Sequence, residues 1–349
     1  MSYVGLVEPE RGLTFLGAPV ESCNIDVFAA DLTTGKTRRL TSHPEYADPV
    51  DLSPDDKWTV VLDTRGTDRL MFVAALRGIP PLIDLVVTGA VSSIRNNGVR
   101  RFFEPWLIDQ YGDRGSYFGQ KINAEGSGIP GSGAINDPDW NGRADPRWSR
   151  DGTQIAYTQI IASSPACGGN NPLPCHNSTE SGGRDERIMI AHLTSRKLLQ
   201  LPAVEPRSDI VPWGQPFPPG ASYPVIESLP PGNYTLKGKV SGWADVSLDT
   251  LYDGGPIAKV SVQYYNYSID GLNVLGGYEN VWKENPTPYD EFVHWYSNLT
   301  QTGPNNGTKI TSADGFHLLI SVDLNFFEAN GTLITTIDGK EYHQPANLT

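Results

Sequence analysis

A strand–turn–strand pattern recurs along the first 200 residues, and it constrains the fold of this chain more than any other feature. Two hairpins, at 47–62 and 144–157, turn at Ser53-Pro-Asp-Asp and Ser149-Arg-Asp-Gly. The serine side chains can bond the turn backbone there, and Gly152 readily adopts a positive φ. Three other segments join an apolar-alternating strand to a polar turn and a second short strand, at 25–41, 69–82 and 187–201. Two such hairpins in about 45 residues are typical of a four-stranded β-propeller blade.

Strand counting predicts three blades, at 13–41, 47–82 and 144–201. A closed propeller needs about four to eight blades, so we expect further blades upstream of Met1 in a longer protein. The loops between second and third strands, and those between consecutive blades, should emerge on one face. A long loop insertion at 83–143 shares that face, where binding and chemistry usually reside. The predicted first domain therefore spans 1–202.

The remainder of the chain is predicted to form a second β domain. Residues 203–231 are dense in proline, which predicts an extended linker. Apolar and polar residues then alternate with period two in four segments, at 234–240, 257–264, 316–326 and 332–337. We therefore expect an immunoglobulin-like β-sandwich at 232–349. The sequence lacks the Cys…Trp…Cys signature of antibody domains, so this prediction concerns architecture alone. The predicted fold class is thus all-β, a partial propeller followed by a sandwich.

The net charge and the apolar content of the chain limit the kinds of partner that it can bind. The formal net charge is −13, with 27 Lys and Arg against 40 Asp and Glu, whereas binding to nucleic acid requires a basic surface. No apolar stretch approaches the roughly 18 residues that a membrane span needs. We therefore expect neither a nucleic-acid partner nor a membrane span.

Several features are typical of a secreted protein. Seven Asn-x-Ser/Thr sequons are acceptors for N-glycosylation in a secreted chain, although turns rich in Asn and Thr also create sequons by chance. Cys167 and Cys175 bracket a turn-rich loop that could close a disulfide, which leaves Cys23 over. No signal peptide begins at Met1, so we expect it to be lost with a missing N-terminus. The sequons are Asn177, Asn233, Asn266, Asn298, Asn306, Asn330 and Asn347.

The sequence contains few motifs that indicate a cofactor or a metal site. Residues 126–131 match G-x-G-x-x-G but neither follow a clear strand nor open a helix, so we interpret them as a loop. No H-E-x-x-H, C-x-x-C or G-x-S-x-G motif occurs. Asp137, Asp139 and Asn141 match part of a calcium loop without its final bidentate Glu, and an Asx-rich turn is the alternative. We expect no cofactor, and no metal beyond this weak calcium candidate.

Carboxylates, arginines and aromatic residues gather in the predicted loop-face segments. Cleaving a glycosidic bond needs one carboxyl group as acid and another as base or nucleophile, about 5 to 9.5 Å apart, with aromatic faces to hold the sugar. An arginine fork suits a uronate carboxylate. Each Asp could instead be a turn residue, and each Trp a packing residue. The predicted catalytic residues are Asp48, Asp63, Glu104 and Asp145, and the predicted substrate-binding residues are His43, Arg65, Arg69, Trp106, Arg114 and Trp140.

Both hairpins resemble the repeats of TolB-type, WD-like β-propellers, with one inserted residue and Asp56 in place of Gly in the first copy. A denser likeness, over roughly residues 12–215, is to the saponin hydrolases of filamentous fungi. It rests on six segments, at 19–28, 63–69, 95–98, 101–114, 117–125 and 140–148. The resemblance implies a secreted propeller enzyme, longer at its N-terminus, that removes a glucuronide-linked sugar chain from triterpene saponins. It carries over no catalytic residues, so the candidates above rest on their chemistry.

Two functions from different classes follow. One is a secreted glycoside hydrolase that acts on a saponin glucuronide, with a carbohydrate-bearing small molecule as its partner. The other is a non-catalytic propeller of TolB-like type, used for binding or scaffolding, whose sandwich is an adhesion or carbohydrate-contact module.

Overall fold

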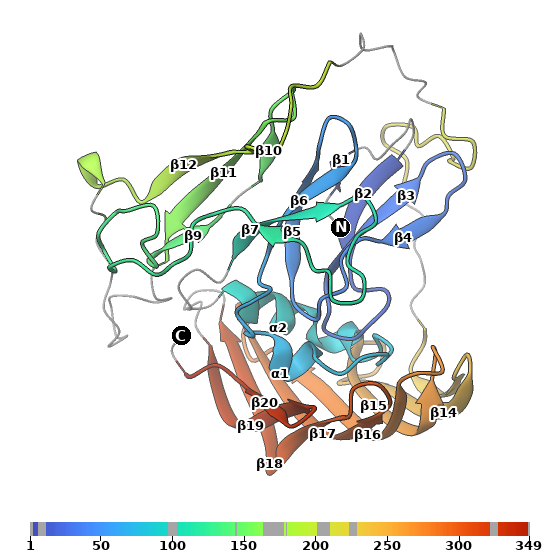
Figure 1. The fold of residues 1–349 in the computed structure, drawn as a ribbon. Coiled ribbons are helices and arrows are strands. Elements are labelled where there is room, and N and C mark those ends of the chain that lie inside the picture. Colours follow the sequence, from blue (N-terminus) through green and yellow to red (C-terminus); the bar gives the residue numbers. More distant parts are fainter. Residues whose placement is uncertain are drawn as a thin grey trace.

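The chain is mostly β, as its sequence predicts. The computed structural model describes residues 3–5, 12–96, 103–143, 145–162, 178, 180–200, 210–222, 229–321 and 327–347. Over these residues the strands form three four-stranded antiparallel sheets and one eight-stranded antiparallel sheet (Figure 1). No helix in the described ranges is long and apolar enough to cross a membrane.

The three small sheets come in chain order. The first contains β1 (Tyr3–Gly5), β2 (Gly12–Gly17), β3 (Asp26–Asp31) and β4 (Thr37–Arg39), each paired with the next. The second contains β5 (Ala47–Leu52), β6 (Trp58–Asp63), β7 (Glu104–Asp109) and β8 (Gln120–Lys121). The third contains β10 (Arg147–Trp148), β11 (Gln154–Ile161) and β12 (Glu186–His192), with β9 (Trp140–Gly142) paired to β11.

The two Ser-x-Asp hairpins form as the sequence predicts, and their turns are nearly identical. Ser53 Oγ donates to Asp55 (2.6 Å) and accepts from the backbone N–H of Trp58 (3.0 Å). Ser149 Oγ donates to Asp151 (2.7 Å) and accepts from the N–H of Gln154 (2.9 Å). The serine thus satisfies the first donor after each turn, which is why these turns can be predicted locally.

The predicted strand pair at 69–82 is wrong. Met71–Ala74 form a short helix, α1, and Asp84–Asn96 form a second helix, α2. Leu70, Phe72 and Val73 are all almost completely buried. An apolar run that is buried on all sides lacks the one-sided periodicity that separates a helix from a strand, so the pattern alone could not decide between them.

Residues 83–143, predicted to be a loop insertion, contribute strands to two sheets. β7 and β8 complete the second sheet, and β9 joins the third. The second sheet therefore takes its third strand from beyond both helices, and the segment between β6 and β7 carries α1 and α2.

One continuous sheet forms where a sandwich was predicted. Its eight strands lie in chain order, each hydrogen-bonded to the next, so the arrangement differs from the two stacked sheets of an immunoglobulin-like domain. Its strands are β13 (Gly232–Lys237), β14 (Ser241–Thr250), β15 (Ile257–Ser268), β16 (Val274–Glu284), β17 (Asp290–Thr302), β18 (Gly307–Ser321), β19 (Glu328–Ile337) and β20 (Lys340–His343).

The two helices cover one face of this sheet and tie it to the rest of the chain. α1 and α2 lie between the eight-stranded sheet and the small sheets (Figure 1). Phe72 of α1 packs edge-on against Phe316 and Phe327. The largest core cluster contains residues of both helices, of the sheet, and of the loops near Cys23 and Tyr46. The opposite face of the sheet, called the outer face below, carries no described residue of this buried cluster.

Candidate functional site

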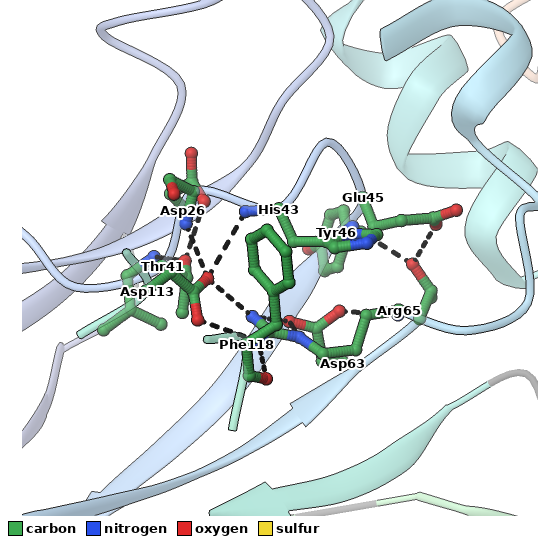
Figure 2. Close-up of polar contacts among 12 residues, drawn as sticks. Asp26, Thr41, His43, Glu45, Tyr46, Asp63, Arg65, Asp113 and Phe118 are labelled. Carbon is green, nitrogen blue, oxygen red and sulfur yellow. Dashed lines mark hydrogen bonds and ion pairs between the residues drawn. The ribbon is translucent and has the colours of Figure 1, made fainter. Parts of the chain in front are cut away.

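Hydrogen bonds join two loops at one end of the second sheet. The loop 42–46 leads into β5, and the loop 63–68 leaves β6. Thr64 Oγ1 donates to Glu45 Oε2 (2.5 Å) and accepts from the backbone N–H of Tyr46 (3.0 Å). The N–H of Thr64 in turn donates to the carbonyl of Tyr46 (3.0 Å). The loops therefore bring together charged residues that are far apart in the sequence (Figure 2).

Arg65 is the centre of this cluster. Its side chain is 2% exposed, and its Nε donates to Asp63 Oδ2 (2.8 Å). Nη1 and Nη2 donate to the two oxygens of Asp113 (3.0 and 3.1 Å), in a fork that also reaches the carbonyl of Phe118. Two carboxylates therefore neutralise one buried guanidinium, in the bidentate geometry that makes arginine pairs strong.

Asp63 lies beside a second buried carboxyl group on the neighbouring strand. Asp63 of β6 is directly opposite Glu104 of β7 in the antiparallel register. Cross-strand partners have Cβ atoms about 5 Å apart and point to the same face. Glu104 also contacts Lys121 Nζ (3.2 Å) and accepts from Asn123 Nδ2 (3.2 Å). The structure thus places two predicted catalytic residues side by side.

Burial favours the neutral form of a third carboxyl group in the cluster. Glu45 is 1% exposed, and this burial, opposed by the hydrogen bond from Thr64 and reinforced by the nearby charge of Asp63, raises its pKa well above the usual value. Glu45 and His43 precede β5, and the predicted catalytic residue Asp48 lies within it. The sequence offers no sign that Glu45 is buried.

Two ring nitrogens in this cluster are buried without a hydrogen-bond partner among the described residues. They are His43 Nδ1 and Trp106 Nε1. The Arg65 guanidinium lies 5.8 Å from the Trp106 ring, and the His43 ring meets Phe118 edge-on at 5.2 Å. Burial lowers the pKa of His43, with opposing contributions from neighbouring carboxylates. Unsatisfied buried polar atoms are rare in folded proteins, and a ligand is one way to satisfy them.

An adjoining ion-pair network was not predicted. Asp26, at the start of β3, accepts from Arg39 Nε (2.9 Å) and from Thr41 Oγ1 (2.7 Å). Arg39 also pairs with Glu21 (2.7 Å). Burial raises the pKa of Asp26 to about 7, while Arg39 and Thr41 act in the opposite direction. The only signal in the sequence is a charged residue at a strand position that should face the core.

Among the remaining catalytic candidates, Asp48 lies at the edge of the cluster and Asp145 lies away from it. Tyr46 Oη donates to Asp48 Oδ2 (3.3 Å). Asp145 is exposed, and its charge acts on Asp51 of β5, whose pKa is raised chiefly by burial.

The predicted substrate-binding residues also separate into two groups. His43, Arg65 and Trp106 meet in the cluster. Arg69 is buried and donates from Nε to the carbonyl of Ile94 (2.8 Å), and burial lowers its pKa to about 10. Arg114 is half exposed and pairs with Asp109 (2.7 Å), while Trp140 is buried beneath the guanidinium of Arg187 (4.1 Å). Arg114 and Trp140 therefore hold loops in place.

The calcium-like segment has the geometry of the alternative, an Asx-rich turn. The carboxylate of Asp137 accepts from the backbone N–H groups of Gly131, Gly133 and Asp139. Asn141 Oδ1 accepts from the N–H of Phe103 (2.8 Å). In the described part of the chain, no group of three or more His, Cys, Asp or Glu side chains is placed to hold a metal ion.

The predicted disulfide and one of the predicted glycosylation sites fall outside the described residues, because Cys167, Cys175 and Asn177 lie in a segment that the structure does not describe. Cys23 is a buried, free cysteine, and burial raises the pKa of its thiol. The six other sequon asparagines are all in the region of the eight-stranded sheet, where Asn233, Asn266, Asn298 and Asn330 lie within strands.

Comparison with known proteins gives only distant likenesses. No protein-family model and no curated protein matches the chain. A crystal structure of TolB from Acinetobacter baumannii is similar at 12% identity with a TM-score of 0.26, covering 96% of this chain and 65% of that one. The chain thus spans slightly less than two thirds of the TolB chain. An uncharacterized protein from Listeria monocytogenes is similar at 8% identity with a TM-score of 0.28, covering 99% and 94%. TM-scores this low assign neither a family nor a function.

Proposed function

We propose that the chain belongs to a secreted glycoside hydrolase that cleaves a glucuronide-linked sugar chain from triterpene saponins. The observation that carries the proposal is the cross-strand pair of Asp63 and Glu104. The Cβ atoms of such a pair lie about 5 Å apart, so their carboxyl groups can reach the separations of about 5 to 9.5 Å that glycosidases use. The sequence resemblance to fungal saponin hydrolases supports the same chemistry.

The surroundings of this pair suit an acidic sugar. Burial raises the pKa of Glu45 well above its usual value, and glycosidic cleavage requires a protonated acid beside an ionised carboxylate. His43 Nδ1 and Trp106 Nε1 are the polar atoms that a sugar could satisfy. Within the same proposal, the three four-stranded sheets are blades of a propeller, and the residues that lock the loops together line its functional end.

Release of the sugar chain from soyasaponin, followed by mass spectrometry, tests the proposal. We expect Glu104→Gln to lower kcat by about 10²- to 10⁴-fold, the usual contribution of an acid–base group. Glu125→Gln is the matched control, because Glu125 is 74% exposed and contacts the same Lys121 (2.7 Å). Equal activity in the two variants would remove Glu104 from the mechanism. An inactive parent protein would overturn the hydrolase.

One observation favours the non-catalytic alternative. The Asp63 carboxylate accepts hydrogen bonds from Arg65, and the Arg65 guanidinium also donates to Asp113, so both side chains already serve the structure. A binding or scaffolding protein needs only that rigidity. It predicts that the parent protein releases no sugar from soyasaponin and that Glu104→Gln changes stability alone.

A further inference from the structure

The outer face of the eight-stranded sheet carries a groove that no role described above uses. It has a volume of about 610 Å³ and lies over β13 to β16. A second hollow of about 470 Å³ shares Thr235 and Asp245 with it and continues toward the β13–β14 turn. The two hollows together cross four strands, which at about 4.8 Å per strand is about 14 Å.

The strand register explains the polar floor of the groove. Asn233, Ser247, Ser261 and Asn280 lie in one cross-strand row, each opposite the next. Thr235, Asp245, Gln263 and Tyr278 form the adjacent row. Small hydroxyl and amide side chains in these rows leave a depression between larger neighbours, and they supply both hydrogen-bond donors and acceptors.

Aromatic rings border this floor on both sides. Trp243 and Tyr265 are stacked with centroids 5.0 Å apart, and both remain at least 40% exposed. On the other side Trp282 stacks on Tyr296 (5.6 Å, 6° between planes). Trp282 and Tyr296 are partly buried, whereas the rings of Trp243 and Tyr265 are exposed. Exposed aromatic faces beside a row of hydroxyl and amide groups match a sugar, whose rings have an apolar C–H face and a rim of hydroxyl groups.

The charge of the groove indicates a neutral ligand. Asp245 is the carboxylate of its polar floor, where it accepts from Thr235 Oγ1 (3.3 Å). Lys237 lines the second hollow. The amide of Gln263 donates to the carbonyl of Gly277 (2.9 Å), which fixes its orientation. A carboxylate on the ligand would be repelled by the negative charge of Asp245. The net charge of the whole chain, −13, would add to this repulsion. The first hollow, which no Lys or Arg lines among the described residues, therefore opposes a uronate, unlike the hydrolytic site proposed above.

We propose that this groove is a binding site for a neutral oligosaccharide, separate from the site around Arg65. It would hold a sugar chain against the protein without cleaving it, because the aromatic walls and polar floor provide contacts and no pair of carboxyl groups. A glycan attached to Asn233 is the competing occupant, because Asn233 is a sequon asparagine and lines the groove.

Calorimetric titration of the 349-residue chain, produced without glycosylation, tests this proposal. The probes are cellohexaose, xylohexaose, mannohexaose and laminarihexaose. We expect at least one to bind with a dissociation constant on the order of 1 mM or lower. Galacturonic acid hexamer should bind at least tenfold more weakly, and Asp245→Asn should reduce that difference. If none of the neutral hexasaccharides binds, the proposal is overturned.

Matched tyrosine variants locate the binding. Tyr278→Ala should weaken binding about tenfold, whereas Tyr289→Ala, at an exposed tyrosine outside the groove, should leave it unchanged. An equal loss in both variants would contradict the assignment. Glu104→Gln should bind neutral sugars like the parent, which separates this test from that of the hydrolase. A glycan on Asn233 of the secreted protein, seen by mass spectrometry, would also overturn the proposal.

Discussion

Arg65 donates two parallel hydrogen bonds, of 3.0 and 3.1 Å, to the carboxylate of Asp113, which lies 48 residues further along the chain. Asp113 Oδ2 also accepts from the backbone N–H of Ser42 (2.8 Å). One buried ion pair therefore joins the loop after β6, the segment after β7 and the loop before β5. The candidate site depends on this connection for its shape.

Loss of the Arg65–Asp113 pair should destabilise the protein strongly. Asp113→Asn leaves a buried guanidinium with one carboxylate, and breaking a buried pair costs about 3 to 5 kcal/mol. Asp109→Asn is the control, because its pair with Arg114 is 48% exposed on the arginine side and such pairs contribute about 0 to 1 kcal/mol. Urea unfolding measures both free energies. Similar losses in the two variants would show that burial does not determine the contribution of Asp113.

Glu45 should make stability depend on pH. Its pKa is raised in the folded state, so above the unfolded-state pKa near 4.5 the folded protein holds a proton that the unfolded chain releases. Stability therefore falls as pH rises from about 4.5. Glu45→Gln removes this loss, so the variant should gain on the parent by up to about 1.4 kcal/mol per pH unit. Urea unfolding from pH 4.5 to 7.5 measures the difference. Glu186→Gln, at an exposed carboxyl group, should show no such trend.

The buried pair in the eight-stranded sheet should behave as a unit. Lys309 Nζ lies 2.7 Å from Glu279 Oε1, and both side chains are fully buried. Trp295 Nε1 also donates to Glu279 (2.8 Å). Lys309→Met should cost about 3 to 5 kcal/mol, because it leaves Glu279 charged and buried. Adding Glu279→Gln should recover part of that loss in a double-mutant cycle. Lys340→Met, which breaks the exposed pair with Asp68, should have an effect near zero. A purely additive double mutant would show that the two charges are independent.

Gly112 should be far less replaceable than Gly115, although both have positive φ. A Cβ atom at Gly112 would lie 2.4 Å from the carbonyl oxygen of Leu40, whereas nothing lies within 4 Å at Gly115. Gly115→Ala should therefore cost only the conformational penalty of about 1 to 2 kcal/mol. Gly112→Ala adds a clash that pushes Asp113 away from Leu40, at a further cost of about 1 to 3 kcal/mol. Thermal unfolding of both variants checks the order, and equal midpoints would contradict it.

Local features were predictable from the sequence because a few neighbouring residues encode them. The turns at Ser53 and Ser149 formed as predicted, since each serine bonds a backbone group five residues away. The apolar run at 69–82 was assigned wrongly, because burial on all sides removes the periodicity that would identify a helix. The eight strands of the last sheet alternate like those of a sandwich, and their pattern does not specify whether one sheet or two will form.

Residue patterns alone predict that this chain is a turn-rich β protein, that its hairpins turn at Ser-x-Asp, and that its acidic and aromatic residues concentrate in particular segments. Which of these residues meet depends on how distant segments pack together. Asp63 and Glu104 are paired in register on β6 and β7, two strands that are separated in the sequence by two helices. The pKa of Glu45 is raised because packing excludes water from it. Both facts depend on contacts between distant segments, which no local pattern of residues encodes.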